Sequence, residues 1–319
     1  MTHDAPLAPP LTGLLCVDAG QTGMKIRVID LADPTRAPIE QTLPGIRTNE
    51  ALLPQLADAA RTVLRLSGVA SEVFTAGVSG LTEQDADAPR LLELLSGTPI
   101  RRVVLAHDST TSYLGALGDL RGAVVAAGTG VVTLAVGERD VARVDGWGHA
   151  MGDAGSGFWI GREVLGAVMR AYDGRGPATT LTAVASEVWP SLPDAYIELQ
   201  ADRDWVRRVA SFAHAAATHA EAGDAVAVSI IERAAIELAR STVTALQRVG
   251  ADHDPTARVC TVGGVFRSPL LRRVFTDELH RAGVSATLEP SHGDGIDGVQ
   301  ALASLRADHP LSAYTSVSG

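Results

Sequence analysis

The chain is short of residues that several classes of protein need. Only two of its 319 residues are cysteine, which excludes a disulfide framework and a cysteine-rich zinc site and fits a reducing compartment. Lysine occurs once, at Lys25, so arginine supplies nearly all of the 27 basic residues. The formal net charge of −10 argues against a nucleic-acid backbone as the main partner.

Long apolar runs are also missing. No stretch approaches the ~18 consecutive apolar residues of a membrane-spanning helix, and the first residues have neither a basic segment nor the apolar core of a signal peptide. We therefore expect a cytoplasmic protein with no membrane partner. The proline-containing start, residues 1–11, is expected to be a disordered tail.

The apolar pattern predicts a similar α/β unit twice. For the first half we expect strands at 14–18, 25–29, 39–43, 73–78 and 103–105, and helices at 50–66, 91–95 and 110–118. For the second half we expect strands at 123–127, 131–136, 141–144, 259–262 and 286–288, a helix-rich stretch at 155–249, and helices at 269–281 and 296–306.

Each half therefore opens with two strands joined by a glycine turn. The simplest architecture is a duplicated α/β unit with a central cleft between its halves. We place the first lobe at 1–118 and the second, with a helical insertion, at 119–319; the last helix can pack on the first lobe. The stretch 180–249 is a candidate face for a homodimer.

A glycine-rich turn over Asp18–Lys25 follows the first strand. Successive backbone N–H groups in such a turn form a nest that binds phosphate oxygens. Asp18 ends a buried strand and can hold magnesium through water, and Lys25 comes back near it on the next strand. The pattern is equally typical of an ordinary hairpin with a solvent-exposed lysine.

Two further features, a second glycine turn and a second aspartate at a strand end, also suit a bound ligand. The turn Gly128-Thr129-Gly130 lies between two buried strands, and two such turns can hold the phosphates of one nucleotide, although each alone is typical of a plain hairpin. Asp108 lies at the carboxyl end of a strand, where open α/β sheets bind ligands. Its carboxylate can accept the proton of an attacking hydroxyl, or it can cap the following helix.

Glycine is concentrated between Gly122 and Gly161, and the stretch Asp145–Arg162 is the most specific in the chain. Its glycines let the backbone approach a ligand, Trp147 offers a flat wall, and Asp153 offers an acceptor for hydroxyl groups. This combination suits a sugar. Further on, a strand, a glycine pair and a proline-started helix over Thr261–Pro269 suit a nucleoside, or a plain strand-helix turn.

Taken in order, these motifs resemble the N-acetylglucosamine kinase group, which shares a family with the BadF/BcrA-type ATPases in the actin/hexokinase superfamily. The stretch Gly146–Arg162 carries the resemblance, and the run Asp173–Pro177 matches a segment that often follows it. The resemblance covers about residues 13–306. It implies duplicated ribonuclease H-like (actin-like ATPase) domains, and ATP and Mg²⁺ as cofactors.

The resemblance also implies roles for single residues. Asp18 would hold magnesium, and Asp108 would be the general base on the sugar 6-hydroxyl. The implied sugar contacts, besides Asp108, are Asn49, Ser79, Trp147, Gly148 and Asp153. The implied nucleotide contacts are Gly20, Gln21, Thr22, Lys25, Thr129, Gly130, Gly263, Gly264 and Arg267.

The sequence departs from the family pattern in two places. Ala19, Gln21 and Gly23 replace residues of the family's first loop, and Ala154 stands where the family usually has glutamate. Because Ala154 adjoins the implied sugar pocket, we expect an ATP-dependent kinase of glucosamine, with N-acetylglucosamine as the alternative acceptor. The resemblance also leaves open a dehydratase-activating ATPase or a non-enzymatic sugar sensor on the same fold.

Overall fold

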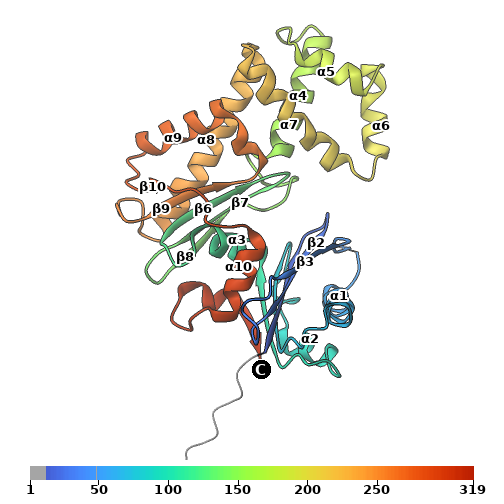
Figure 1. The fold of residues 1–319 in the computed structure, drawn as a ribbon. Coiled ribbons are helices and arrows are strands. Elements are labelled where there is room, and N and C mark those ends of the chain that lie inside the picture. The colour runs from blue at the N-terminus through green and yellow to red at the C-terminus, as the bar shows by residue number, and fades with distance from the viewer. Residues whose placement is uncertain (1–11, 48) are drawn as a thin grey trace, which may run out of the picture. The chain divides into compact units, whose positions relative to one another are not determined.

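The computed structural model describes residues 12–47 and 49–319, so the expected tail over residues 1–11 lies outside the described residues. The chain divides into two compact units (Figure 1). Unit 1 comprises Met1–Asp119 and His292–Gly319, and unit 2 comprises Leu120–Ser291.

Unit 1 is built on a six-stranded sheet in the order β11-β5-β4-β1-β2-β3. β1, β4 and β5 run parallel, whereas β2 is antiparallel to β1 and β3, and β11 is antiparallel to β5. The strands are β1 (Gly13–Ala19), β2 (Met24–Asp30), β3 (Ile39–Leu43), β4 (Val73–Val78), β5 (Arg102–His107) and β11 (Thr315–Ser318).

The alternation along β1 assigns its side chains to two cores. Leu15 and Val17 pack with the core under α1 (Leu52–Ser67) and α2 (Ala88–Leu94). Leu14 and Cys16 pack on the other face, with Ile296. Because successive side chains of a strand point to opposite faces, Asp18 lies on this second face, which α3 (Asp108–Leu117) and α10 (Gly295–Ala301) cover.

Unit 2 contains a five-stranded sheet in the order β10-β9-β6-β7-β8. β6, β7 and β8 form an antiparallel meander, while β9 is parallel to both β6 and β10. The strands are β6 (Gly122–Ala127), β7 (Val131–Val136), β8 (Val141–Val144), β9 (Arg258–Val262) and β10 (Thr287–Leu288).

The helices of unit 2 bury one large apolar core against this sheet. α8 contacts β6, β7 and β8, whereas α5 and α6 pack on neighbouring helices, at the far end of the unit from its strands (Figure 1). The helices are α4 (Gly157–Tyr172), α5 (Leu181–Val188), α6 (Ala195–Ala201), α7 (Trp205–Glu221), α8 (Ala225–Arg248) and α9 (Pro269–Arg281).

Both units repeat one arrangement, an antiparallel meander whose first strand pairs in parallel with a later strand. The duplicated α/β fold is therefore confirmed. The last strand, β11, was not expected from the sequence. None of the helices in the described part of the chain is long and apolar enough to cross a membrane.

Candidate active site

Two of the expected functional carboxylates lie at one edge of the unit 1 sheet. Asp18 is near the end of β1, and Asp108 directly follows β5. β1, β4 and β5 are parallel, so their carboxyl ends meet at the same edge, where open sheets bind ligands. Asp108 is close enough to Asp18 for its charge to raise the pKa of Asp18.

The surroundings of Asp18 hold its proton unusually tightly. Burial raises the pKa of Asp18 to about 6, the charge of Lys25 opposes this rise, and the charges of Asp108 and Asp294 add to it. Lys25 lies directly opposite Asp18 on β2, and its Nζ is 3.0 Å from Asp294 Oδ2. The hydrogen bond from Lys25 to Asp294 raises the pKa of Lys25, which therefore stays charged.

Asp108 lies beside His107, the residue before it. His107 Nδ1 lies 2.8 Å from Asp108 Oδ1 and 3.1 Å from the backbone N of Ser109. The cap of α3 is thus the imidazole of His107, which accepts from Ser109 N–H. The interpretation of Asp108 as the helix cap is wrong, because Asp108 is the first residue inside the helix, and its carboxylate is left for other partners.

The carboxylates of unit 1 suit a magnesium ion bound through water. Within residues 12–47 and 49–319, no group of three or more His, Cys, Asp or Glu side chains is arranged to hold a metal ion directly. Asp18 carries the destabilised negative charge that a divalent cation would neutralise. Magnesium usually keeps several waters and needs one or two carboxylates, which matches Asp18 with Asp108 nearby.

The other expected site residues of unit 1 lie in the β1–β2 turn, after β4 and before α1. Gln21 and Thr22 are exposed in the β1–β2 turn, which Gly20 N–H closes by donating to Gly23 O at 3.0 Å. Ser79 follows β4, and its N–H donates to Ala19 O at 2.9 Å. Asn49 is exposed in the turn before α1.

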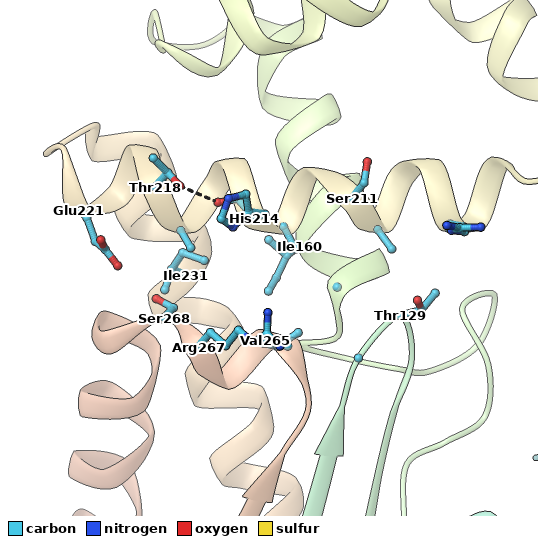
Figure 2. A pocket seen from close by; sticks show the side chains of 17 residues that line it. Thr129, Ile160, Ser211, His214, Thr218, Glu221, Ile231, Val265, Arg267 and Ser268 are labelled. Carbon is cyan, nitrogen blue, oxygen red and sulfur yellow. Dashed lines mark hydrogen bonds between the residues drawn. The ribbon is translucent and has the colours of Figure 1, made fainter. Parts of the chain in front are cut away.

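Unit 2 contains a cavity of about 570 Å³ (Figure 2). Its floor includes Thr129 of the β6–β7 turn, together with Gly264 and Arg267 of the segment after β9. The α7 helix supplies the opposite wall, with His214 among its side chains. This volume is within the range of small-molecule sites, so three of the expected nucleotide contacts share one pocket.

Glycine is required where β9 leaves the sheet. Gly263 has φ +103°, and a Cβ there would lie 2.2 Å from Ala127 O. Gly264, the next residue, begins a short 3₁₀ helix (Gly264–Arg267) on the pocket floor. The close approach of β9 to β6 thus places the Gly263-Gly264 backbone beside the β6–β7 turn.

The expected sugar-contact residues of unit 2 lie in one loop between β8 and α4. Asp153 is buried against Gly130, where a Cβ would lie 2.7 Å from Asp153 Oδ2. Burial raises the pKa of Asp153, and the charge of Asp145 raises it further. Trp147 is 63% exposed and Gly148 is also exposed, so both are available to a ligand.

Several residues of these sites were not expected from the sequence. Asp294 begins a capping box of α10 with Asp297, and the spacing of these two residues before an apolar run is the signal that marks it. The α7 wall has the signal of helical periodicity: its polar pocket-lining residues recur every three or four positions, at Arg207, Ser211, His214, Thr218 and Glu221.

A family model that covers most of the chain identifies its family. The model of the BadF/BadG/BcrA/BcrD ATPase family matches residues 16–299. The chain belongs to this family, which confirms the resemblance carried by the glycine-rich loop.

Curated relatives are kinases of amino sugars. The N-acetyl-D-glucosamine kinase of Dictyostelium discoideum is 30% identical over 193 residues, which are 57% of this chain and 60% of that protein. The N-acetylmuramic acid/N-acetylglucosamine kinase of Clostridium acetobutylicum is 26% identical over 178 residues, 52% of this chain and 55% of that protein. The chain thus matches less than two thirds of the length of either relative.

Solved structures show the same fold. A Chromobacterium violaceum protein provisionally named N-acetylglucosamine kinase has a TM-score of 0.68 at 22% identity, covering 92% of this chain and 100% of that one. A glucokinase of the ROK family from Streptomyces griseus, solved with glucose and AMPPNP, has a TM-score of 0.52 at 15% identity, covering 92% and 98%. The actin-like ATPase fold is therefore confirmed.

Proposed function

We propose that the chain is an ATP-dependent sugar kinase that phosphorylates the 6-hydroxyl of N-acetylglucosamine or a close relative. The observation that carries the proposal is the placement of Asp18 and Asp108 at one sheet edge, in a member of this ATPase family. Both curated relatives are N-acetylglucosamine kinases by name. The comparisons therefore favour N-acetylglucosamine over the glucosamine expected from the sequence.

Asp108 is the general base of the proposed reaction. With one carboxylate oxygen beside His107, its other oxygen can take the proton of the sugar hydroxyl as the hydroxyl oxygen attacks the γ-phosphorus of ATP. The bond from this phosphorus to the β,γ-bridging oxygen breaks, and ADP leaves. Asp18 holds magnesium through water, and the ion, when bound, supplies charge neutralisation on the phosphates. Phosphoryl transfer depends mainly on such positioning and charge stabilisation, so few side chains need to react.

The nucleotide contacts are proposed on the two glycine turns and in the unit 2 pocket. Gly20, Gln21, Thr22 and Lys25 form the first group, and Thr129, Gly130, Gly263, Gly264 and Arg267 form the second. The backbone N–H groups of such turns bind phosphate oxygens. Arg267 is exposed at the pocket floor and adds positive charge there. The sugar contacts are Asn49, Ser79, Trp147, Gly148 and Asp153.

Glucosamine remains the second candidate acceptor because of one residue. Ala154 follows the proposed sugar contact Asp153 at a position where the sequence pattern of the group has glutamate. A smaller, neutral side chain there changes the pocket beside the acceptor, and pocket shape decides between such closely related sugars.

A coupled assay of ADP release over N-acetylglucosamine, glucosamine, N-acetylmuramic acid and glucose tests the proposal. We expect the highest kcat/KM for N-acetylglucosamine, and a loss of about 10² to 10⁴ in kcat for Asp108→Ala, the range of general-base catalysis. Asp58→Ala, on an exposed side chain of α1, is the matched control. A higher kcat/KM for glucosamine would select the second candidate.

Two outcomes would contradict a kinase altogether. Sugar binding without ADP release, at any sugar tested, would indicate a sensor. Purified protein containing an iron–sulfur cluster would indicate a dehydratase activator, although Cys16 and Cys260 are both buried and free, in strands of different units.

A further inference from the structure

The loop between β8 and α4 contains unusual backbone. Asp145 and Asp153 have φ of +60° and +58°, and in the described part of the chain they alone combine a side chain with positive φ. Such backbone is sterically costly and persists only where the surroundings hold it, most often at functional sites. The surroundings here must therefore hold both ends of the loop.

The carboxylate of Asp145 stabilises the loop through three hydrogen bonds from backbone N–H groups. Its Oδ1 accepts hydrogen bonds from the backbone N–H of Gly146 and of Asp153, both at 2.8 Å, and its Oδ2 accepts from Ala154 N–H at 3.0 Å. The side chain of Asp145, the first residue of the loop, thus binds the backbone of Asp153 and Ala154 near the other end of the loop. The fit leaves little space, since a Cβ at Gly152 would lie 2.5 Å from Asp145 Oδ1.

The other end of the loop depends on this closure. Asp153 is 7% exposed, and backbone N–H groups of Val131 and Gly148 donate to its side chain. Arg143, on β8, reaches Gly146 O at 2.6 Å and stacks over the Trp147 ring at 5.6 Å. The closed loop therefore orients every proposed sugar contact that unit 2 contributes.

We propose that Asp145 is a positioning residue for sugar binding, which acts by closing the loop that holds Asp153. The inference rests on the proposed function, because it assigns the loop to the sugar. Asp145 itself has both oxygens engaged by backbone N–H groups, so it acts through Asp153 rather than on the substrate. Sequence spacing alone assigns Asp145 no role, since its three acceptor contacts depend on the folded loop.

The charge of Asp145 affects the pKa of Asp153, which gives the proposal a pH-dependent test. Burial is the main cause that raises the pKa of Asp153; the charge of Asp145 adds to it, while His149 and the N–H groups of Val131 and Gly148 lower it. Arg143 is engaged with Gly146 O and Trp147. Removing the charge at position 145 therefore lowers the pKa of Asp153, and Asp153 stays ionised to lower pH.

Three variants separate the contributions of charge, hydrogen bonding and backbone strain. Asp145→Asn keeps a side chain that tolerates positive φ and one acceptor oxygen. Asp145→Gly removes the carboxylate and relieves the strain. Asp145→Ala removes the carboxylate and keeps the strain. Asp140→Asn, on an exposed residue of the turn before β8, is the control.

We expect Asp145→Gly to raise the KM for sugar by at least ~10-fold, with the KM for ATP within about twofold of wild type. Asp145→Asn should raise the sugar KM less and shift the acidic limb of kcat/KM for sugar to lower pH. Asp140→Asn should change neither quantity. Even if Asp145→Ala fails to fold, the other two variants decide the question.

Two results would overturn the inference in distinguishable ways. If the asparagine and glycine variants lose thermal stability but keep the sugar KM and the pH profile of wild type, Asp145 has a structural role only. If wild-type protein turns over no sugar, the proposed function fails and the inference fails with it.

Discussion

Asp18 shows, at the scale of one residue, how a buried carboxylate at a proposed magnesium site opposes stability. Burial raises its pKa to about 6 from an ordinary 3.8. Between about pH 4 and pH 6 the folded chain therefore keeps a proton that the unfolded chain releases. The carboxylate destabilises the fold increasingly as pH rises through this window, and the full cost applies above it.

Asp18→Asn should consequently stabilise the protein while it removes activity. At pH 8 we expect a gain of about 1–3 kcal/mol in the free energy of unfolding, since one pKa unit corresponds to 1.36 kcal/mol. The gain should vanish below about pH 4, where both states are protonated. Thermal melts from pH 4 to pH 8 measure it, with the exposed Asp58→Asn as control. A gain that is equal at both pH values would contradict the assignment.

The site residues at this scale are predictable only in part. Asp18 and Asp108 can be found because Asp18 lies near the end of the buried strand β1 and Asp108 directly follows β5, and the parallel strands of the sheet bring such positions to one edge. The spacing of Asp294 and Asp297 marks the start of a helix, but it cannot show the contact of Asp294 with Lys25, because that contact joins residues 269 positions apart. The role of His107 as the cap of α3 cannot be predicted either, because it depends on side-chain geometry that the spacing of residues in the sequence does not show.

At the scale of elements, unit 1 depends on the close packing of α3 and α10. A Cβ at Gly298 would lie 1.7 Å from Thr111 O, and a Cβ at Gly115 would lie 2.0 Å from Asp294 O. The two helices come together with backbone against backbone. This contact holds the segment that begins at His292 on unit 1, and it places Asp294 beside Lys25.

Gly298→Ala and Gly115→Ala should therefore each destabilise the protein by about 1–3 kcal/mol or more, the cost of overpacking. Gly166→Ala is the matched control, because Gly166 also lies inside a helix but faces only the end of the Arg170 side chain, at 3.3 Å. It should stabilise α4 by up to about 1 kcal/mol, since alanine favours helix over glycine. Urea unfolding of the three variants measures the contrast. Equal effects would show that helix propensity, rather than packing, decides.

Most elements could be predicted because their apolar residues repeat with a clear period. β3 and β4 occupy the expected residues, and each has the branched or alternating pattern of a strand. β11 could not be predicted: its sequence Thr-Ser-Val-Ser has one apolar residue, and it forms only because β5 offers an unpaired edge. The sequence of α7 predicts a helix but does not show that this helix lines a pocket. Its apolar residues indicate a core-facing helix, and its polar residues have the pattern of an ordinary solvated face.

At the scale of the molecule, helix α6 of unit 2 has apolar side chains that no other part of this unit covers. α6 buries none of its residues, and its Tyr196 and Ile197 are 61% and 55% exposed. Short helices are stable mainly through the packing of an apolar face, and neighbouring exposed apolar side chains are typical of interaction surfaces. The helical stretch 180–249, expected from the sequence as a dimer face, includes this region.

We therefore predict a homodimer in which α6 contributes to the interface. Light scattering after size exclusion should give twice the chain mass of 33.2 kDa. The double variant Tyr196→Glu, Ile197→Glu should give the mass of one chain, because burying two carboxylates in an apolar contact is strongly unfavourable. Leu66→Glu, on an exposed α1 residue of unit 1, should leave the mass unchanged. A wild-type mass of one chain would refute the dimer, and a dimer that survives the double substitution would exclude α6 from its interface.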